Sequence, residues 1–160
     1  MTKIWVYDTE SDGLTPEATK IHCMVMNELG TDNWRTFTDT GSKIAKIANS
    51  GNIFVAHNQL DHDLRLFRKL YNIPFYVGPD TWSSTKCQFW DTLVISRELF
   101  PDRPGGHGLE AWGKRVHLWK PEVNDWVNLP VETYVHRCEE DVKINIKTLE
   151  LLLKEAEIKI

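Results

Sequence analysis

Two carboxylates, Asp8 and Glu10, follow a short apolar run, Ile4–Tyr7, that predicts a β-strand. Because successive side chains of a strand alternate faces, Asp8 and Glu10 point to the same side, about 7 Å apart along the backbone. Neighbouring carboxylates repel each other unless a positive group lies between them, and Mg²⁺ prefers such oxygen ligands. The pattern indicates a metal site. The alternative is a strand that simply ends in a polar turn at Asp12-Gly13.

A second polar group, His57-Asn58-Gln59-Leu60-Asp61-His62-Asp63, lies between a predicted buried strand over 52–56 and a predicted helix over 61–71. Ligands of open α/β sheets bind at such strand-to-helix edges. Asp61 is a suitable N-cap, so helix capping is the alternative explanation for this group. Asp63 falls in the first helical turn, near the core-facing side, where a carboxylate needs a partner. A cation would be such a partner.

The third group precedes and opens a predicted final helix over 138–156. Asp141 lies close to the apolar face of that helix, whereas Glu139 and Glu140 are expected to face water. His136 stands five residues before Asp141, about 140° round an ideal helix, so the two cannot share a helix face. If both serve one site, His136 must come from the loop or first turn that leads into the helix.

Alternating elements are expected to position these groups. Strands are predicted over 4–7, 21–26, 33–37, 52–56 and 89–90, with a hairpin signal at Gly30-Thr31-Asp32. Helices are predicted over 42–48, 61–71, 92–100, 109–116 and 138–156, with loops over 74–86 and 102–106 and an irregular stretch over 121–130. Three strands in series followed by alternating helices and strands indicate an α/β sheet of mixed strand direction.

Composition narrows the class of protein. The 160 residues predict one domain over 1–160, and the net charge of −4 argues against a basic coat for duplex DNA. Three widely spaced cysteines (Cys23, Cys87 and Cys138) form no zinc or disulfide pattern, which favours a reducing compartment. No apolar run approaches the roughly 18 residues of a membrane span, and no signal-peptide pattern opens the chain. We therefore expect a cytoplasmic protein with no membrane partner.

Together the motifs resemble those of a known superfamily. Asp8-Thr9-Glu10 with Gly13-Leu14, His57-Asn58 with Asp63, and His136 with Asp141 resemble the three exonuclease motifs of the DnaQ-like (DEDD) superfamily. Residues 91–97 and 107–113 resemble connecting helices in the proofreading domains of phage DNA polymerases. The resemblance spans nearly the whole chain. It implies a ribonuclease H-like fold, with a central five-stranded mixed sheet flanked by helices, and removal of nucleotides from 3′ ends.

The resemblance also implies roles for individual residues. Two Mg²⁺ or Mn²⁺ ions would be held by Asp8, Glu10, Asp63 and Asp141, and Glu10 would belong to the catalytic set with His136. His136 would accept the proton of the attacking water. The substrate would be contacted by Thr9, Leu14, His57 and Asn58, with Leu14 against the terminal base.

Two departures from the family pattern matter. Both Asp61 and Asp63 are near the position of the second-motif acid, and we choose Asp63 because the residues after it match the family's helix. Arg137 stands where the polymerase domains usually carry tyrosine. His136 instead fits the histidine variant of the third motif, which predicts the DEDDh branch.

The predicted substrate is the 3′ end of single-stranded nucleic acid, with DNA favoured, in a bacterial or phage-infected cell. A DNA polymerase is a candidate partner. Three alternatives remain open: the same chemistry on short RNA, a non-catalytic module that docks on a polymerase, and a nucleotide-binding domain without nuclease activity. The last lacks a glycine-rich phosphate loop.

Overall fold

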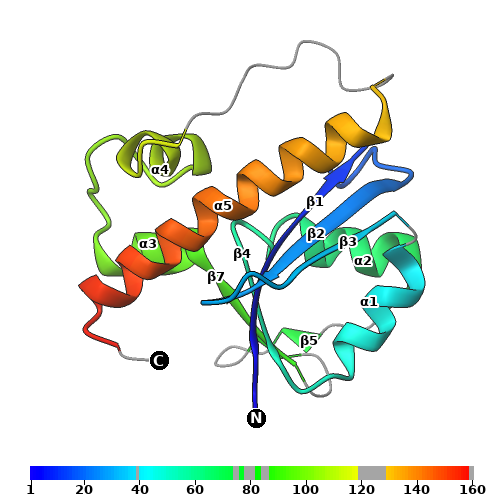
Figure 1. Ribbon diagram of the computed structural model, residues 1–160, viewed down its shortest axis with the longest axis horizontal. Helices are drawn as coiled ribbons and strands as arrows, with labels where there is room; N and C mark the ends of the chain where they lie inside the picture. The colour runs from blue at the N-terminus through cyan, green and yellow to red at the C-terminus, as the bar shows by residue number, and fades with distance from the viewer. Residues whose placement is uncertain (39, 74–75, 78–81, 84–86, 119–128, 159–160) are drawn as a thin grey trace.

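A mixed β-sheet forms the centre of the protein. The computed structural model describes residues 1–38, 40–73, 76–77, 82–83, 87–118 and 129–158 (Figure 1). The five central strands are β1 (Ile4–Ser11), β2 (Ile21–Glu28), β3 (Trp34–Phe37), β4 (Ile53–Ala56) and β7 (Gln88–Asp91). Two-residue strands β5 (Tyr76–Val77) and β6 (Trp82–Ser83) extend one edge, which gives the order β3-β2-β1-β4-β7-β6-β5.

Strand directions follow the predicted mixture. The series β1, β2 and β3 is antiparallel, with β2 and β3 joined through the predicted hairpin turn. The central pairs β1–β4 and β4–β7 are parallel. Their carboxyl ends therefore meet at one edge of the sheet, where side chains from separate parts of the chain come together.

Helices cover both faces of the sheet. They are α1 (Thr40–Ala48), α2 (Asp63–Tyr71), α3 (Thr92–Leu99), α4 (Leu109–Arg115) and α5 (Val131–Glu155). Figure 1 shows α5 crossing β1 and β2, with α3 and α4 beside its C-terminal half. None of the helices in the described ranges is long and apolar enough to cross a membrane.

The alternation of β1 assigns its side chains to two separate cores. Trp5 and Tyr7 pack in the core on the side of α1 and α2. Val6 packs on the opposite side, with Cys138 and Val142 of α5. By the same alternation Asp8 and Glu10 point toward α5, whereas Thr9 points toward α2.

Two predicted boundaries are wrong. The segment 74–86 was expected to be a loop, but it contributes β5 and β6. The final helix begins at Val131, directly after Pro130, rather than near Cys138. Proline is well tolerated at a helix start, and Tyr134 and Cys138 continue the buried stripe of α5 toward its N-terminus. The predicted irregular stretch over 121–130 lies largely outside the described residues.

Candidate active site

A cluster of three carboxylates lies where β1 meets α5. Among the described residues, Asp8, Glu10 and Asp141 each offer one oxygen, and these atoms lie within 4.8 Å of one another. Alternation along β1 places the first two on the α5 side of the sheet. One turn of α5 packs directly against this strand, since Cys138 Sγ donates a hydrogen bond to the backbone oxygen of Asp8 at 2.9 Å. The predicted pairing of the first and third motifs is therefore present in the structure.

The cluster is electrostatically unfavourable without a cation. Burial raises the pKa of Asp8 well above its usual value, and the nearby charges of Asp141 and Glu10 raise it further. Burial likewise raises the pKa of the Cys138 thiol, so no thiolate adds to the charge. Carboxylate oxygens are the ligands that Mg²⁺ and Mn²⁺ take, and a divalent ion would remove the repulsion. The donor set fits such an ion.

Asp63 lies near the cluster but on the other side of β1. Its side chain is 2% exposed, and Oδ1 accepts a hydrogen bond from the Thr9 hydroxyl. Burial raises the pKa of Asp63, partly offset by His62 and by this hydroxyl. Thr9, which was predicted to contact substrate, is buried, and its hydroxyl holds Asp63; the substrate contact stays a prediction. Asp63 is not one of the three clustered carboxylates.

An open cavity adjoins both Asp8 and Asp63. Its volume is about 610 Å³, and the predicted substrate residues Leu14, His57 and Asn58 border it. Leu14 is 73% exposed although it is a large apolar residue. The described cavity wall also includes Thr15, Pro16, Asp61, His62, Arg65 and Lys69. Residues of the first two motifs thus surround a single space.

Asp91 positions the loop that carries His57 and Asn58, a role not predicted from sequence. Its carboxylate accepts backbone hydrogen bonds from Asn58 at 2.8 Å and Leu60 at 3.1 Å. It also caps α3 by accepting from Leu93 N at 3.0 Å. These bonds hold Asn58 in a left-handed conformation, with φ of 63°. The signal was an aspartate between a strand and a helix, which is typical of an N-cap.

His57 is also fixed by its neighbours. Its Nδ1 lies 2.8 Å from the Thr92 hydroxyl, which donates to Asn145 Oδ1 of α5 at 2.7 Å. Both Thr92 and Asn145 are buried. This chain links the second-motif loop to the helix that carries Asp141.

His136 does not take the predicted approach to the cluster. Since α5 begins at Val131, His136 lies within the helix rather than in a lead-in loop, and it is exposed. Arg137 is 7% exposed and stands four residues before Asp141, about 40° away round the helix. Arg137, not His136, therefore shares the buried face of α5 with Asp141. The role of His136 as a base stays a prediction that this geometry does not support.

The sheet and helices have the fold of solved nuclease structures, which confirms the predicted ribonuclease H-like fold. No protein-family model matches the sequence. In sequence the chain is similar to a DNA-directed DNA polymerase of Escherichia phage T7, with 28% identity over 147 residues. That match covers 75% of this chain and 20% of the polymerase.

Three solved structures illustrate the similarity of fold. RNase D of Escherichia coli, an exoribonuclease, has a TM-score of 0.67 at 16% identity, covering 98% of this chain and 40% of that one. NrnC of Brucella melitensis has a TM-score of 0.66 at 16% identity, covering 98% and 75%. Exonuclease I of E. coli, in complex with a dT13 oligonucleotide, has a TM-score of 0.61 at 13% identity, covering 98% and 42%. The chain thus spans only a fifth of the curated relative and about two fifths of two of these structures.

Proposed function

We propose that residues 1–160 form a metal-dependent 3′–5′ exonuclease domain that hydrolyses single-stranded nucleic acid, preferentially DNA, from its 3′ end. One observation carries the proposal: Asp8, Glu10 and Asp141 converge beside an open cavity in an exonuclease fold. Like charges held close together and partly out of water are destabilising, so this cluster argues for a function rather than for folding.

Three residues would bind metal directly. Asp8, Glu10 and Asp141 supply oxygens on the α5 side of β1, and Asp63 would complete the set from the α2 side. Mg²⁺ or Mn²⁺ fits these donors, and two ions would use all four acids. When bound, such ions lower the pKa of an attacking water and stabilise the charge on the leaving oxygen.

The remaining roles belong to the cavity wall. Leu14 would lie against the terminal base, and Asn58 and His57 would contact the terminal nucleotide. The loop of the second motif is held by Asp91 and Thr92 before any substrate arrives, which reduces the ordering cost of binding. A single-stranded end suits this site, because the last nucleotide must leave the base stack to enter a cavity.

The comparisons bear on whether the substrate is DNA or RNA. Similarity to a phage polymerase and to an exonuclease I bound to dT13 supports DNA, whereas similarity to RNase D supports RNA. A DNA polymerase remains a candidate partner on the same ground. Discrimination would require a contact to the 2′-hydroxyl group.

A direct assay tests the proposal. Single-stranded DNA and RNA of identical sequence, labelled at the 5′ end, are incubated with Mg²⁺, with Mn²⁺ or with chelator. We expect products that shorten progressively from the 3′ end, and loss of cleavage with chelator and in Asp8→Ala. Asp102→Ala, which removes an exposed aspartate, is the matched control. Absence of cleavage of both polymers in both metals would refute the proposal.

A further inference from the structure

Lys69 of α2 ties down the turn that carries Leu14. Its ammonium group donates hydrogen bonds to the backbone oxygens of Thr15 at 3.1 Å, Pro16 at 2.9 Å and Ala18 at 2.6 Å. An ammonium has three N–H donors, and here each has an acceptor. Lys69 borders the cavity, yet its donors are engaged by the protein itself. This geometry is that of a tether and not of a phosphate ligand.

The rest of the turn is ordered in the same way. Leu14 O accepts from Glu17 N at 3.0 Å and Ala18 N at 2.8 Å, which closes the turn on itself. A second link to the start of α2 joins Thr15 Oγ1 and His62 Nδ1 at 3.2 Å. At the base of the turn, Asp12 accepts from Thr19 N at 2.8 Å and Lys20 N at 3.2 Å.

This order contrasts with the exposure of Leu14. An apolar side chain that is 73% exposed gains little from burial in the folded chain, so core packing does not explain why its backbone is fixed from several sides. A surface fixed in advance binds a partner with a smaller loss of conformational entropy. The apolar partner within reach of the carboxylates, in the proposed function, is the base of the terminal nucleotide.

We propose that Lys69 is a positioning residue, which holds Leu14 against the terminal base so that the last phosphodiester lies at the acid cluster. The inference rests on the proposed exonuclease function and adds a device for orienting the end of the substrate. Lys69 acts only through the 14–18 turn. Misplacing the terminal nucleotide should lower kcat more than it raises KM, because orientation governs the chemical step.

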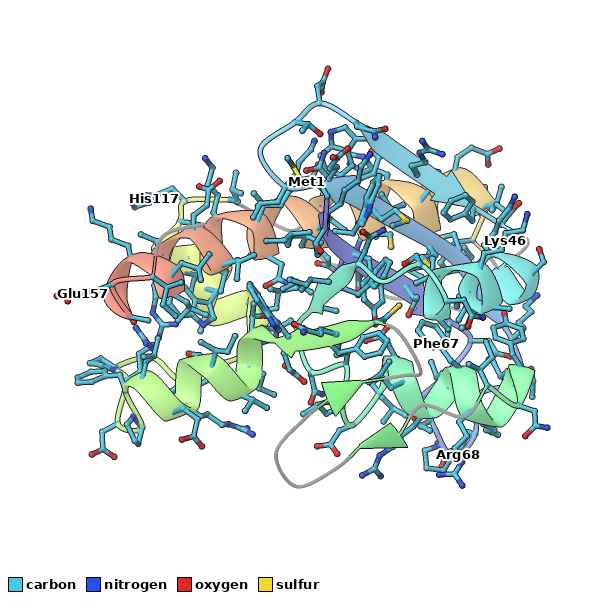
Figure 2. All side chains as sticks on the ribbon, turned by 90° about the horizontal axis from the view of Figure 1, so that it is seen from below. Met1, Lys46, Phe67, Arg68, His117 and Glu157 are labelled. Carbon is cyan, nitrogen blue, oxygen red and sulfur yellow. The ribbon has the colours of Figure 1, made fainter. Side chains whose placement is uncertain are left out.

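A double-mutant cycle with Leu14 tests this role. Lys69→Met keeps most of the apolar stem and removes the donors, Lys69→Arg restores donors, and Leu14→Ala removes the side chain being positioned. Arg68→Met is the matched control, because it removes a neighbouring exposed charge of the same helix (Figure 2). The figure shows Arg68 at the surface and Phe67 packed inward, in agreement with the exposed fraction of 2% for Phe67.

The expected result is a non-additive loss. Lys69→Met should lower kcat about tenfold in the wild-type background and less than about twofold in the Leu14→Ala background. Lys69→Arg should recover most of the activity, and Arg68→Met should match wild type. Amide hydrogen exchange at Glu17 and Ala18 should accelerate in Lys69→Met, which reports on the turn independently of activity.

Two results would overturn the tether. One is an equal loss from Lys69→Met with and without Leu14, since that would show a general structural role. The other is Lys69→Met indistinguishable from Arg68→Met in both kcat and exchange. A wild-type protein inactive in both metals would instead overturn the proposed function, and with it the substrate half of the inference. In that case, if Lys69→Met exchanged the amides of Glu17 and Ala18 at the wild-type rate, the tether would be refuted as well.

Discussion

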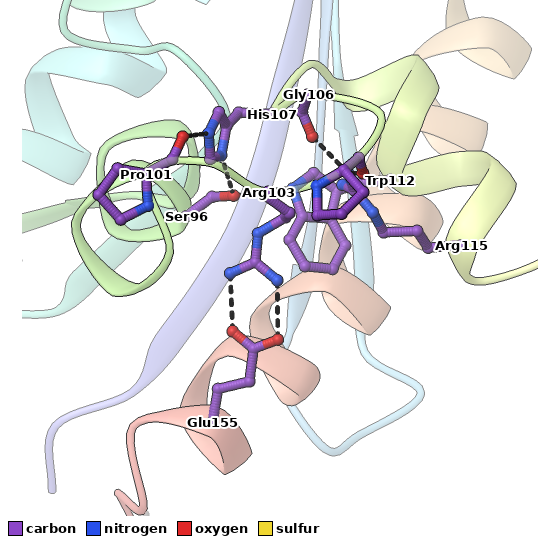
Figure 3. Close-up of polar contacts among 9 residues, drawn as sticks. Ser96, Pro101, Arg103, Gly106, His107, Trp112, Arg115 and Glu155 are labelled. Atoms are coloured by element: carbon purple, nitrogen blue, oxygen red, sulfur yellow. Dashed lines mark hydrogen bonds and ion pairs between the residues drawn. The ribbon is translucent and has the colours of Figure 1, made fainter.

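The middle and the C-terminal end of α5 carry opposite electrostatic arrangements. Near the middle of the helix, Asp141 joins Asp8 and Glu10 in a group of like charges. Near its C-terminus, Glu155 accepts two hydrogen bonds from Arg103, at 2.8 and 2.7 Å, and the Arg103 guanidinium lies over the Trp112 ring, 4.8 Å from its centroid (Figure 3). Arg115 lies over the same ring at 4.6 Å. Like charges repel at the first region, and opposite charges attract at the second.

The difference separates what the fold needs from what the proposed reaction needs. The C-terminal group, Arg103, Trp112, Arg115 and Glu155, binds the loop after α3 and the helix α4 to α5, with charges paired inside the protein. In the acid cluster, by contrast, burial and the neighbouring carboxylates Asp141 and Glu10 raise the pKa of Asp8. Sites that bind an external cation hold like charges close together in this way. Mutations in the two regions should therefore separate activity from stability.

The largest effect is expected from Asp8→Asn. Losing a carboxylate of the cluster should lower activity by at least about 10³-fold, about 4 kcal/mol of transition-state stabilisation. The same change removes like-charge repulsion, so in chelator the variant should be more stable than wild type by on the order of 1 kcal/mol. Steady-state kinetics and thermal unfolding measure the two effects. A destabilised Asp8→Asn would contradict the contrast between the acid cluster and the C-terminal group.

The third motif offers a comparison of adjacent residues. Arg137 shares the buried face of α5 with Asp141, and a guanidinium there can neutralise charge beside the cluster. We expect Arg137→Ala to lower kcat/KM by about 10–100-fold, or about 1.4–2.7 kcal/mol. His136→Ala should remain within about threefold of wild type, because the imidazole is exposed and lies about 140° from Asp141 round the helix. A loss of about 10²–10⁴-fold in His136→Ala would restore it as the general base.

Disrupting the C-terminal group should lower stability and leave activity unchanged. The Arg103 side chain is only 8% exposed. Arg103→Met removes its ion pair with Glu155 and its stacking on Trp112. We expect a loss of about 1–3 kcal/mol in unfolding free energy, which lowers Tm by several degrees. Activity per folded molecule should be unchanged below Tm. An equal loss of activity at low temperature would show that the acid cluster and the C-terminal group are coupled.

The smallest expected effect is that the acid cluster and the C-terminal group change protein stability with pH in opposite directions. The raised pKa of Asp8 means that the folded state holds this proton more tightly, so its contribution to stability falls as pH rises from the ordinary value of 3.8 through the raised pKa. The Arg103 guanidinium lowers the pKa of Glu155, whose contribution is present above the ordinary value of 4.5 and is lost as pH falls through the lowered pKa.

Unfolding curves in chelator across this range measure both signs. Asp8→Asn should flatten the decline at higher pH, and Glu155→Gln should flatten the loss at lower pH. The Glu155 effect should be below about 1 kcal/mol, since its side chain is 42% exposed. If stability changed with pH in the same way in Asp8→Asn and Glu155→Gln, the opposite roles of these two carboxylates would be contradicted.

Local patterns predicted much of this molecule. The alternation of β1 correctly put Asp8 and Glu10 on one face, and the apolar stripes predicted α2 and α5. The start of α5 was missed although Pro130 marks the boundary and Tyr134, Cys138 and Val142 continue the buried stripe at helical spacing. His136 was predicted to lie in a loop or first turn before Asp141, but α5 already begins five residues before His136.

Other features depend on contacts that no local pattern encodes. The Thr9 hydroxyl donates a hydrogen bond to Asp63, which is 54 residues away in the chain. The Asp91 carboxylate accepts one from the backbone of Asn58, which is 33 residues away. Lys69 reaches three carbonyl oxygens of a distant turn, and a lysine in the last turns of a helix carries no sequence signal for such a role. Such positioning interactions are set by tertiary packing.

The continuity of α5 limits how this chain can change in length. A single helix of 25 residues carries Asp141 near its middle and Glu155 at its C-terminal end, so their relative rotation is fixed by the number of residues between them. Inserting or deleting one residue in that interval would rotate one end by about 100° and shift it by about 1.5 Å. Either the acids or the Arg103 partner would then face the wrong way. Substitutions on the exposed face of α5 are compatible with both regions, whereas length changes between them are not.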